Sequence, residues 1–244
     1  MRTYAIGDIH GHLDLLKAAH ARIAADRERV GDSDAPVVHL GDLVDRGPDS
    51  AGVIDYLSQG IARGENWLVL RGNHDRMFAG FLGDATYHDP RLRPDYDWTH
   101  PRVGGIETLE SYGIVDPGGR PPAQVQAETV AAVPASHRAL LQGMLNSYRR
   151  GEVLFVHAGI RPGVALEEQT EDDLIWIRGE FHQDTRDHGV LVIHGHTPVE
   201  KPTHFGNRVD IDSGAAYGGP LTAIVVEDRE VFVLTDAGRA PLLP

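Results

Sequence analysis

Residues 2–27 read RTYAIGDIHGHLDLLKAAHARIAADR and contain an apolar segment, a polar turn and a periodic segment in direct succession. The first segment, Arg2–Gly7, predicts a short strand that ends at glycine. Apolar residues at positions 13, 15, 16, 19, 23 and 24 then repeat with a helical period. Between the two stands GDIHGH. We therefore expect a strand–turn–helix unit whose turn carries Asp8 and His10.

The same pattern recurs along the chain. APVVHLG (35–41) predicts a second strand, SAGVIDYLSQGIARG (50–64) a second helix, and NWLVLRG (66–72) a third strand. A βαβαβ order is typical of a parallel or mostly parallel sheet with helices packed on it. Further strands are predicted over 152–159, 190–195, 208–212, 221–227 and 230–235. The last two are joined only by Asp228 and Arg229, which predicts an antiparallel hairpin.

Residues 84–150 interrupt this order. The segment is rich in Pro, Asp and aromatic residues, and helical patterns follow around 105–112, 122–132 and 134–149. Strand patterns resume after it. We therefore expect one domain over residues 1–244, with residues 84–150 inserted into it as a cap.

Composition narrows the class of protein. The formal net charge is −13, from 36 acidic and 23 basic residues, so long-range repulsion disfavours nucleic-acid binding. No apolar run approaches the length of a membrane helix, and the N-terminal residues do not resemble a signal peptide. We therefore expect a soluble, cytoplasmic protein. Cysteine is absent, which excludes disulfides and thiolate ligands and leaves His, Asp, Glu and Asn to hold any metal.

Five predicted strands end in polar residues, most of them of types that commonly bind metals. The segments are GDIHGH (Asp8, His10), GDLVDRGPDS (Asp42, Asp45, Arg46), RGNHD (Asn73, His74), FVHAG (His157) and VIHGHTP (His194, His196). Ligands of α/β sheets collect at the carboxyl ends of strands, where the loops converge. Each fragment alone is more often a turn or a packing histidine, but five of them, each directly after an apolar strand, favour a shared site.

The donor types indicate the metal. Asp and Asn oxygens together with neutral imidazoles suit Mn, Fe, Zn or Ni, whereas an all-oxygen set would suit Mg or Ca. One carboxylate, such as that of Asp42, can bridge two ions through its two oxygens. A pair of ions about 3.5–4 Å apart can stabilise both the attacking and the leaving oxygen of an in-line displacement and can supply hydroxide near neutral pH.

The series GDIHG, GDLVDRGP, RGNHD, VHAG and HGHTP resembles the PPP-type protein phosphatases of the calcineurin-like metallophosphoesterase superfamily, in particular their bacterial branch. The match runs from about residue 3 to 235 and is poor over 84–150. The resemblance implies an α/β fold in which a central β-sandwich of mixed sheets is flanked by helices. It also implies two divalent metal ions, with Mn²⁺ first and Fe, Zn or Ni as alternatives.

The resemblance assigns roles to individual residues. The implied metal ligands are Asp8, His10, Asp42 (bridging), Asn73, His157 and His196. His74 would be the general acid for the leaving alkoxide, oriented by Asp45, because a neighbouring carboxylate favours a protonated imidazole. Arg46 would clamp the substrate phosphate together with Arg178 and Asn73, since a planar guanidinium suits phosphate oxygens.

Three further residues have weaker assignments. Arg161, in HAGIRPG, competes with Arg178 for the second phosphate clamp. Tyr217 stands where the family has a substrate-facing loop, although packing would explain it equally well. His194 is left out of the metal set, and we expect it to have a structural role beside the ligands.

Two departures from the family pattern bear on the substrate. Pro198 stands where many superfamily phosphodiesterases have another histidine ligand, which favours the PPP type. Asp75 replaces the glutamate usual in eukaryotic protein phosphatases, as in related symmetrical diadenosine tetraphosphatases. We therefore predict hydrolysis of phosphoserine or phosphothreonine, with phosphotyrosine as a further substrate, by direct attack of a metal-bound hydroxide. The alternative is a symmetrical bis(5'-nucleosyl)-tetraphosphatase, and a third, a non-catalytic binding scaffold, would be expected to have lost its ligands.

Overall fold

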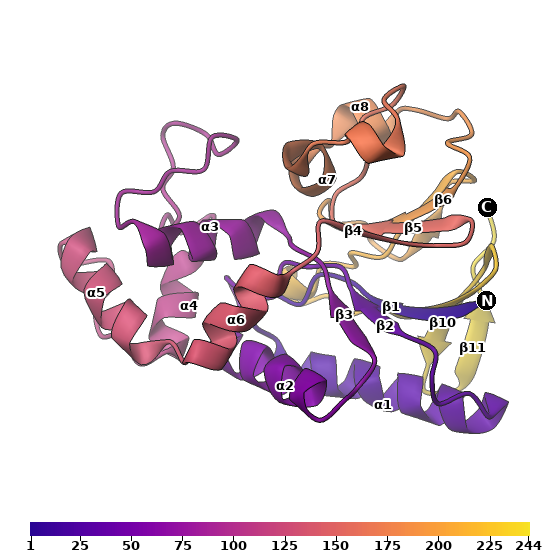
Figure 1. Ribbon diagram of the computed structural model, residues 1–244, viewed down its shortest axis with the longest axis horizontal. Helices are drawn as coiled ribbons and strands as arrows, with labels where there is room; N and C mark the ends of the chain where they lie inside the picture. The colour runs from indigo at the N-terminus through magenta and orange to yellow at the C-terminus, as the bar shows by residue number, and fades with distance from the viewer.

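The first strand of the chain lies near the middle of a six-stranded sheet (Figure 1). The computed structural model describes residues 1–244. The strand order is β11-β10-β9-β1-β2-β3, formed by β1 (Arg2–Ile6), β2 (Val37–His39), β3 (Trp67–Val69), β9 (Ala223–Glu227), β10 (Glu230–Thr235) and β11 (Gly238–Pro241). β1, β2 and β3 are parallel, whereas β9 runs antiparallel to β1. The hairpin predicted around Asp228 and Arg229 is confirmed, because β9 and β10 pair antiparallel across that turn.

A second, five-stranded sheet packs against the first. Its order is β4-β5-β6-β8-β7, formed by β4 (Ser147–Arg150), β5 (Val153–Val156), β6 (Leu191–His194), β7 (Thr203–His204) and β8 (Arg208–Asp210). β5, β6 and β8 are parallel, with β4 and β7 antiparallel at the two edges. Side chains of both sheets, among them Ala5, Val38, Phe155, Ile193 and Ile224, form one apolar core between them. The sheets therefore make a sandwich.

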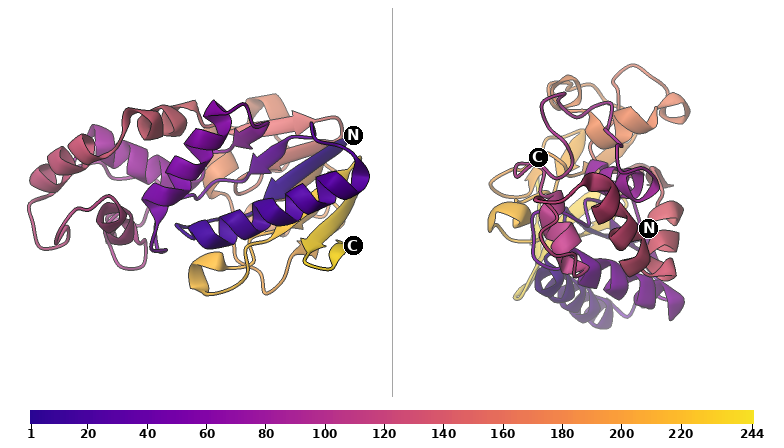
Figure 2. Two further views of the ribbon diagram at one scale, coloured as in Figure 1. Left: turned by 90° about the horizontal axis from the view of Figure 1, so that it is seen from below. Right: turned by 90° about the vertical axis from the view of Figure 1, so that its left-hand side faces the viewer.

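Helices cover the outer faces of the sandwich. In β1 the side chain of Ala5 points into the sandwich, while its neighbours Tyr4 and Ile6 belong to the core beneath the helices, as the two-residue period of a strand requires. That second core lies under α1 (Leu13–Val30) and α2 (Ser50–Ala62). Figure 2 shows α1 lying across the outer face of the six-stranded sheet. The short helices α7 (Glu171–Trp176) and α8 (Gly179–His182) cover the other sheet.

Four helices extend the molecule beyond one end of the sandwich: α3 (Asn73–Gly83), α4 (Gly105–Ser111), α5 (Pro122–Ala132) and α6 (Ala135–Gly143) (Figure 1). The helix predicted over 134–149 is too long. α6 ends at Gly143, and β4 pairs with β5 so that Tyr148 lies opposite Phe155. The error has a physical reason, since this edge strand is only partly buried and its sequence, SYRR, lacks apolar alternation.

Several elements have no counterpart among the sequence-based expectations. They are α3, α7, α8, β7, β11 and two short 3₁₀ helices, Leu166–Glu168 and Ala215–Tyr217. No helix in the structure is both long enough and apolar enough to span a bilayer. The division into one domain with residues 84–150 as a cap stays a prediction, with the correction that Ser147–Arg150 is part of a sheet.

Candidate metal centre

The backbone is unusual at the ends of the strands. Only seven non-glycine residues have a positive φ, and five of them were predicted to belong to the site: His10 (45°), Asp42 (47°), Asp45 (74°), Arg46 (69°) and His196 (72°). Left-handed conformations of this kind are uncommon outside glycine and concentrate where a loop must aim its side chains. The loops after β1, β2 and β6 are therefore shaped to turn these side chains toward one another.

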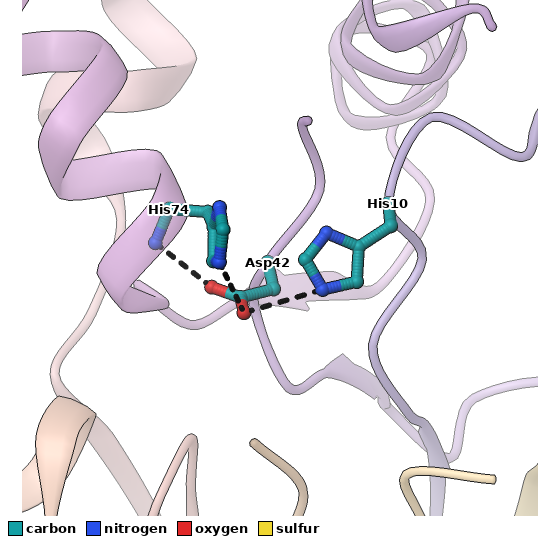
Figure 3. Close-up of side chains that lie close together, drawn as sticks. All are labelled: His10, Asp42 and His74. Carbon is teal, nitrogen blue, oxygen red and sulfur yellow. Dashed lines mark hydrogen bonds and ion pairs between the residues drawn. The ribbon is translucent and has the colours of Figure 1, made fainter. Parts of the chain in front are cut away.

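A first group of potential ligands is His10, Asp42 and His74 (Figure 3). Nδ1 of His10 donates to the Val44 carbonyl at 2.8 Å, so Nε2 is an acceptor; it accepts from Nη1 of Arg46 and lies 3.5 Å from Oδ2 of Asp42. Nε2 of His74 lies 4.0 Å from the same oxygen. Burial, with the nearby Arg46 adding to it, holds the pKa of His10 well below its usual value. His10 is therefore neutral, as a metal ligand must be.

A second group shares Asp42 and adds His157 and His196. Nδ1 of His157 donates to the Leu40 carbonyl at 2.9 Å, so its Nε2 is free to accept. That nitrogen lies 3.4 Å from Oδ1 of Asp42, 3.1 Å from Oδ1 of Asn73 and 3.2 Å from Nδ1 of His196. Asp42 thus presents one carboxylate oxygen to each group, as the predicted bridging role requires.

Two observations test whether these residues fit a metal. Nε2 of His196 and Oδ1 of Asp8 are buried without any hydrogen-bond partner, and such orphaned atoms are costly unless something binds them. Burial alone would raise the pKa of Asp42, but the imidazoles of His157, His74 and His10 lower it, so the carboxylate is ionised. A buried carboxylate surrounded by imidazoles is a donor set that suits divalent transition metals.

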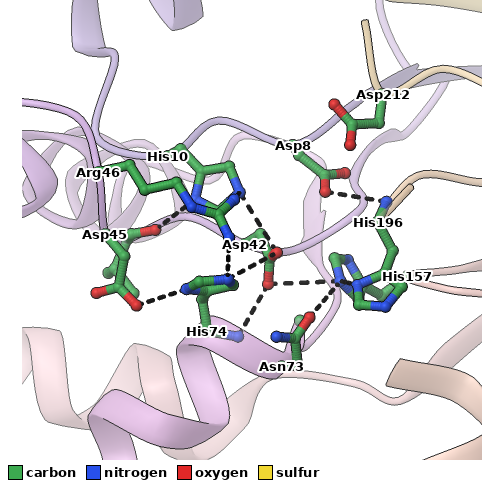
Figure 4. Close-up of polar contacts among 12 residues, drawn as sticks. Asp8, His10, Asp42, Asp45, Arg46, Asn73, His74, His157, His196 and Asp212 are labelled. Carbon is green, nitrogen blue, oxygen red and sulfur yellow. Dashed lines mark hydrogen bonds and ion pairs between the residues drawn. The ribbon is translucent and has the colours of Figure 1, made fainter. Parts of the chain in front are cut away.

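Asp8 stands apart from both groups. Its Oδ2 accepts the backbone N–H of His196 at 3.0 Å, and its other oxygen has no partner. Figure 4 shows Asp8 beside Asp212, a residue that the sequence reasoning missed. Burial and then the charges of Asp212 and Asp42 raise the pKa of Asp8, and burial raises the pKa of Asp212 to about 6. The assignment of Asp8 to a metal stays a prediction.

The predicted acid and its orienting carboxylate are in contact. Nδ1 of His74 lies 2.6 Å from Oδ2 of Asp45, which is fully buried. Asp45 also accepts the indole N–H of Trp98 at 2.9 Å and the hydroxyl of Thr108 at 2.7 Å. Trp98 and Thr108 lie in the predicted cap, and neither was anticipated from sequence, because nothing local marks them. Trp98 and Thr108 therefore fix the position of the carboxylate that contacts His74.

Arg46 is placed between the imidazoles. Its Nη1 and Nη2 lie 2.9 Å from Nε2 of His10 and 2.9 Å from Nε2 of His74, and its guanidinium carbon is 5.4 Å from the centre of the exposed Tyr217 ring. Nη1 of Arg178 donates to the Thr197 hydroxyl at 3.2 Å, next to His196. Both arginines line one cavity together with Asn73 and His74.

The remaining predicted residues are engaged elsewhere. Arg161 pairs with Asp173 at 2.6 Å and with Glu180 at 3.0 Å, which favours a structural role over phosphate binding. Asp75 is buried, and its carboxylate accepts the backbone N–H groups of Gly72 and Leu43, each at 2.9 Å. It therefore joins the loop after β2 to the start of α3 and does not face the cavity, whose lining omits it.

His194 also has a structural environment. It forms a third group of potential ligands with His182 and Asp210. However, its Nδ1 lies 3.1 Å from the Gly195 carbonyl and its Nε2 accepts from Nη1 of Arg208 at 3.0 Å. Both ring nitrogens therefore have hydrogen-bond partners within the protein.

The chain is similar to known proteins over most of its length. The profile of the calcineurin-like phosphoesterase family matches residues 1–225. A relative from Geobacillus thermodenitrificans, named bis(5'-nucleosyl)-tetraphosphatase PrpE [asymmetrical], is 28% identical over 92% of this chain and 90% of its own.

Two crystal structures share the fold. One is of a protein named as a candidate diadenosine tetraphosphatase (TM-score 0.60, 20% identity, 99% of this chain and 94% of that one). The other is the cold-active protein-tyrosine phosphatase of a psychrophilic Shewanella (TM-score 0.59, 17% identity, 99% and 80%). The predicted fold class, a sandwich of mixed sheets flanked by helices, is confirmed. This chain therefore belongs to the calcineurin-like phosphoesterase family and is a metallophosphoesterase, a hydrolase whose family binds a dinuclear metal centre.

Proposed function

We propose that this metallophosphoesterase cleaves dinucleoside tetraphosphates, with phosphoserine and phosphothreonine in proteins as the second candidate substrate. The observation that carries the chemistry is the pair of ligand groups that share Asp42, with the His74–Asp45 contact directly beside them. The nucleotide is placed first because the relative that spans 92% of this chain carries the tetraphosphatase name. That relative is called asymmetrical, so we expect ATP and AMP as the products from diadenosine tetraphosphate, whereas the sequence alone suggested the symmetrical reaction.

The ligands divide into two sets around Asp42. His10 with Asp42, and His157 and His196 with Asp42, would hold the two ions, with Asn73 and Asp8 as further oxygen donors. When bound, a metal pair supplies hydroxide near neutral pH and neutralises charge on the phosphoryl group. We propose Mn²⁺ as the first choice, with Fe, Zn or Ni as alternatives.

His74 and Arg46 have coupled roles in this proposal. Nε2 of His74 accepts a hydrogen bond from Arg46, so Nε2 carries no proton while that bond is present. Protonation of Nε2 removes its lone pair, and the guanidinium must then turn away. Phosphoryl oxygens are the partners that a released guanidinium fork would bind. His74 then donates its proton to the leaving oxygen while Asp45 retains Nδ1.

The test is a substrate panel with purified protein from which metals have been removed by a chelator. After Mn²⁺ is restored, kcat/KM is measured for diadenosine tetraphosphate, for phosphoserine and phosphothreonine peptides, and for p-nitrophenyl phosphate, with chromatography of the nucleotide products. We expect the highest value for the tetraphosphate. A preference for the phosphopeptides would put the second candidate first. Absence of activity with every divalent metal would leave the scaffold alternative, although that role predicts lost ligands and every predicted ligand is present.

A further inference from the structure

A strongly cationic cavity lies beside the candidate metal centre. Its volume is about 210 Å³, and its lining includes five arginines: Arg46, Arg91, Arg93, Arg102 and Arg178. No aspartate or glutamate lines it. The whole chain has a formal charge of −13, so the overall composition does not explain a local excess of arginine. Such a cavity attracts anions.

Three of these arginines come from the loop between α3 and α4. The loop is fixed at several points: Asp89 accepts two hydrogen bonds from Arg76 of α3, at 2.7 and 2.9 Å, and the buried Trp98 donates to Asp45. Within this fixed loop, Arg102 donates to the Tyr96 hydroxyl at 3.0 Å. The loop therefore holds its cationic side chains in place next to the site.

The three arginines differ in how they are engaged. Arg93 forms an exposed ion pair with Asp95 at 2.8 Å, of a kind that contributes little to stability. Arg102 has only the hydroxyl of Tyr96 as a partner, and the guanidinium of Arg91 has no hydrogen bond or ion pair. Arg91 and Arg102 are thus not neutralised by any acidic side chain.

A single phosphoryl group does not need this many cations. Arg46 and Arg178 lie next to the predicted metal ligands and suffice as clamps for the group under attack. We propose that Arg91, Arg93 and Arg102 form a subsite for the other phosphates of a linear polyphosphate, and so select substrates by phosphate number. This inference rests on the proposed function. Guanidinium forks match the oxygens of successive phosphates, for which a lysine would offer only a point charge.

A neighbouring cavity is less suited to the other phosphates than the arginine-lined cavity. It has a volume of about 460 Å³ and shares Arg46 and Arg102, but Glu107 and Tyr217 also line it. A carboxylate repels a phosphate chain, whereas the first cavity has none. The aromatic ring of Trp176 in the first cavity is a surface on which a base can stack.

The test uses inhibition, so that it does not depend on the true substrate. With free Mn²⁺ held constant, inhibition constants are measured for inorganic tripolyphosphate and for orthophosphate against p-nitrophenyl phosphate hydrolysis. We expect tripolyphosphate to bind more tightly to the wild type. Arg91→Ala and Arg102→Ala should each weaken tripolyphosphate roughly tenfold, the loss of one charge-assisted contact, and should weaken orthophosphate much less.

Two variants serve as controls. Arg102→Lys keeps the charge but loses the fork, and should fall between the wild type and Arg102→Ala. Arg229→Ala removes an exposed arginine from the β9–β10 turn, at the opposite end of the sheet from the site, and should leave both inhibition constants unchanged.

The outcomes separate the two proposals. Equal inhibition by the two anions, equal weakening of both in the variants, or the same loss in Arg229→Ala would overturn the subsite. Tighter inhibition by an acidic phosphopeptide than by tripolyphosphate would also overturn it. If tripolyphosphate behaves as expected but diadenosine tetraphosphate is not cleaved, the subsite stands and the proposed function fails. If the tetraphosphate is cleaved equally well by all variants, the function stands and the subsite fails.

Discussion

Replacing Asp45 with asparagine isolates the contribution of one charge to the proposed proton donor. The carboxylate is fully buried and accepts from His74 and Trp98 on Oδ2 and from Thr108 on Oδ1. An asparagine of the same shape can keep its oxygen at the Oδ2 position. Its NH₂ group then faces the Thr108 hydroxyl, which can rotate to accept. Asp45→Asn should therefore fold and keep His74 in place.

The magnitude follows from the change in bond type. A hydrogen bond to a charged partner contributes about 1.5–3 kcal/mol, and a neutral one about 0.5–1.5 kcal/mol. The bond from His74, at 2.6 Å, should therefore lose about 1–1.5 kcal/mol. Since about 1.4 kcal/mol corresponds to a tenfold change in rate, kcat for an alkyl phosphate should fall about tenfold.

The assay compares two leaving groups in the presence of saturating Mn²⁺. Phosphoserine expels a poor alkoxide that needs a proton, whereas p-nitrophenolate leaves with little assistance. Asp45→Asn should slow phosphoserine hydrolysis far more, and His74→Asn should do the same by roughly 10²–10⁴-fold. Equal losses on both substrates, with unchanged metal content, would refute the reasoning that His74 is the acid. Equal losses together with lost metal would instead make His74 a ligand, as its place 4.0 Å from Asp42 allows.

Three further predictions concern the metals, the substrate clamp and stability. Asp42→Asn should abolish turnover and reduce bound metal at both positions, and elemental analysis that finds a full complement would exclude the bridging role. Arg178→Ala should raise KM or the phosphate inhibition constant roughly tenfold, while an unchanged affinity would exclude Arg178 as the clamp. Asp26→Asn should lower the free energy of unfolding by about 2 kcal/mol at pH 7, because Arg239, Arg29 and Tyr4 outweigh the effect of burial and lower the pKa of Asp26 to about 2. The folded pKa lies below the unfolded one, so this stabilisation exists above pH 4 and disappears as pH falls toward 2. Urea unfolding at several pH values checks it, and a difference between the two proteins that persists at pH 2 would contradict it.

The sequence predicted the centre of the site because one rule produces it. Parallel strands end at the same edge of a sheet, so polar residues that directly follow buried strands must meet there. This rule places His157 and His196 together at the end of one sheet and Asp42 at the end of the other, and the packing of the two sheets brings the three side chains into one group. Asp212 obeys the same rule, because it follows β8 by two residues, and the segment RVDIDSG could have identified it.

The edge strands and the contacts of Asp45 with the cap could not be predicted from the sequence, for physical reasons. β4 and β7 are short edge strands with polar sequences, and β11 is an edge strand with only partial burial, so none shows the apolar alternation that identifies a buried strand. The contacts of Trp98 and Thr108 with Asp45 span 53 and 63 residues of sequence. A buried indole N–H has a partner in most structures, but no local pattern specifies which one.

The loop between α3 and α4 joins two properties that look separate in the sequence. Its Gly104 has a φ of 93°, and a Cβ at this position would clash with the backbone N of Arg46. The carbonyl of Gly104 instead accepts that N–H at 3.1 Å, so the loop is attached directly to the proposed phosphate clamp. The same loop supplies Trp98 to Asp45 and the three arginines to the cavity. Any change that displaces the loop must therefore alter the orientation of the proposed acid and the binding of distal phosphates together. Separating these two effects requires substitutions of the arginine side chains alone.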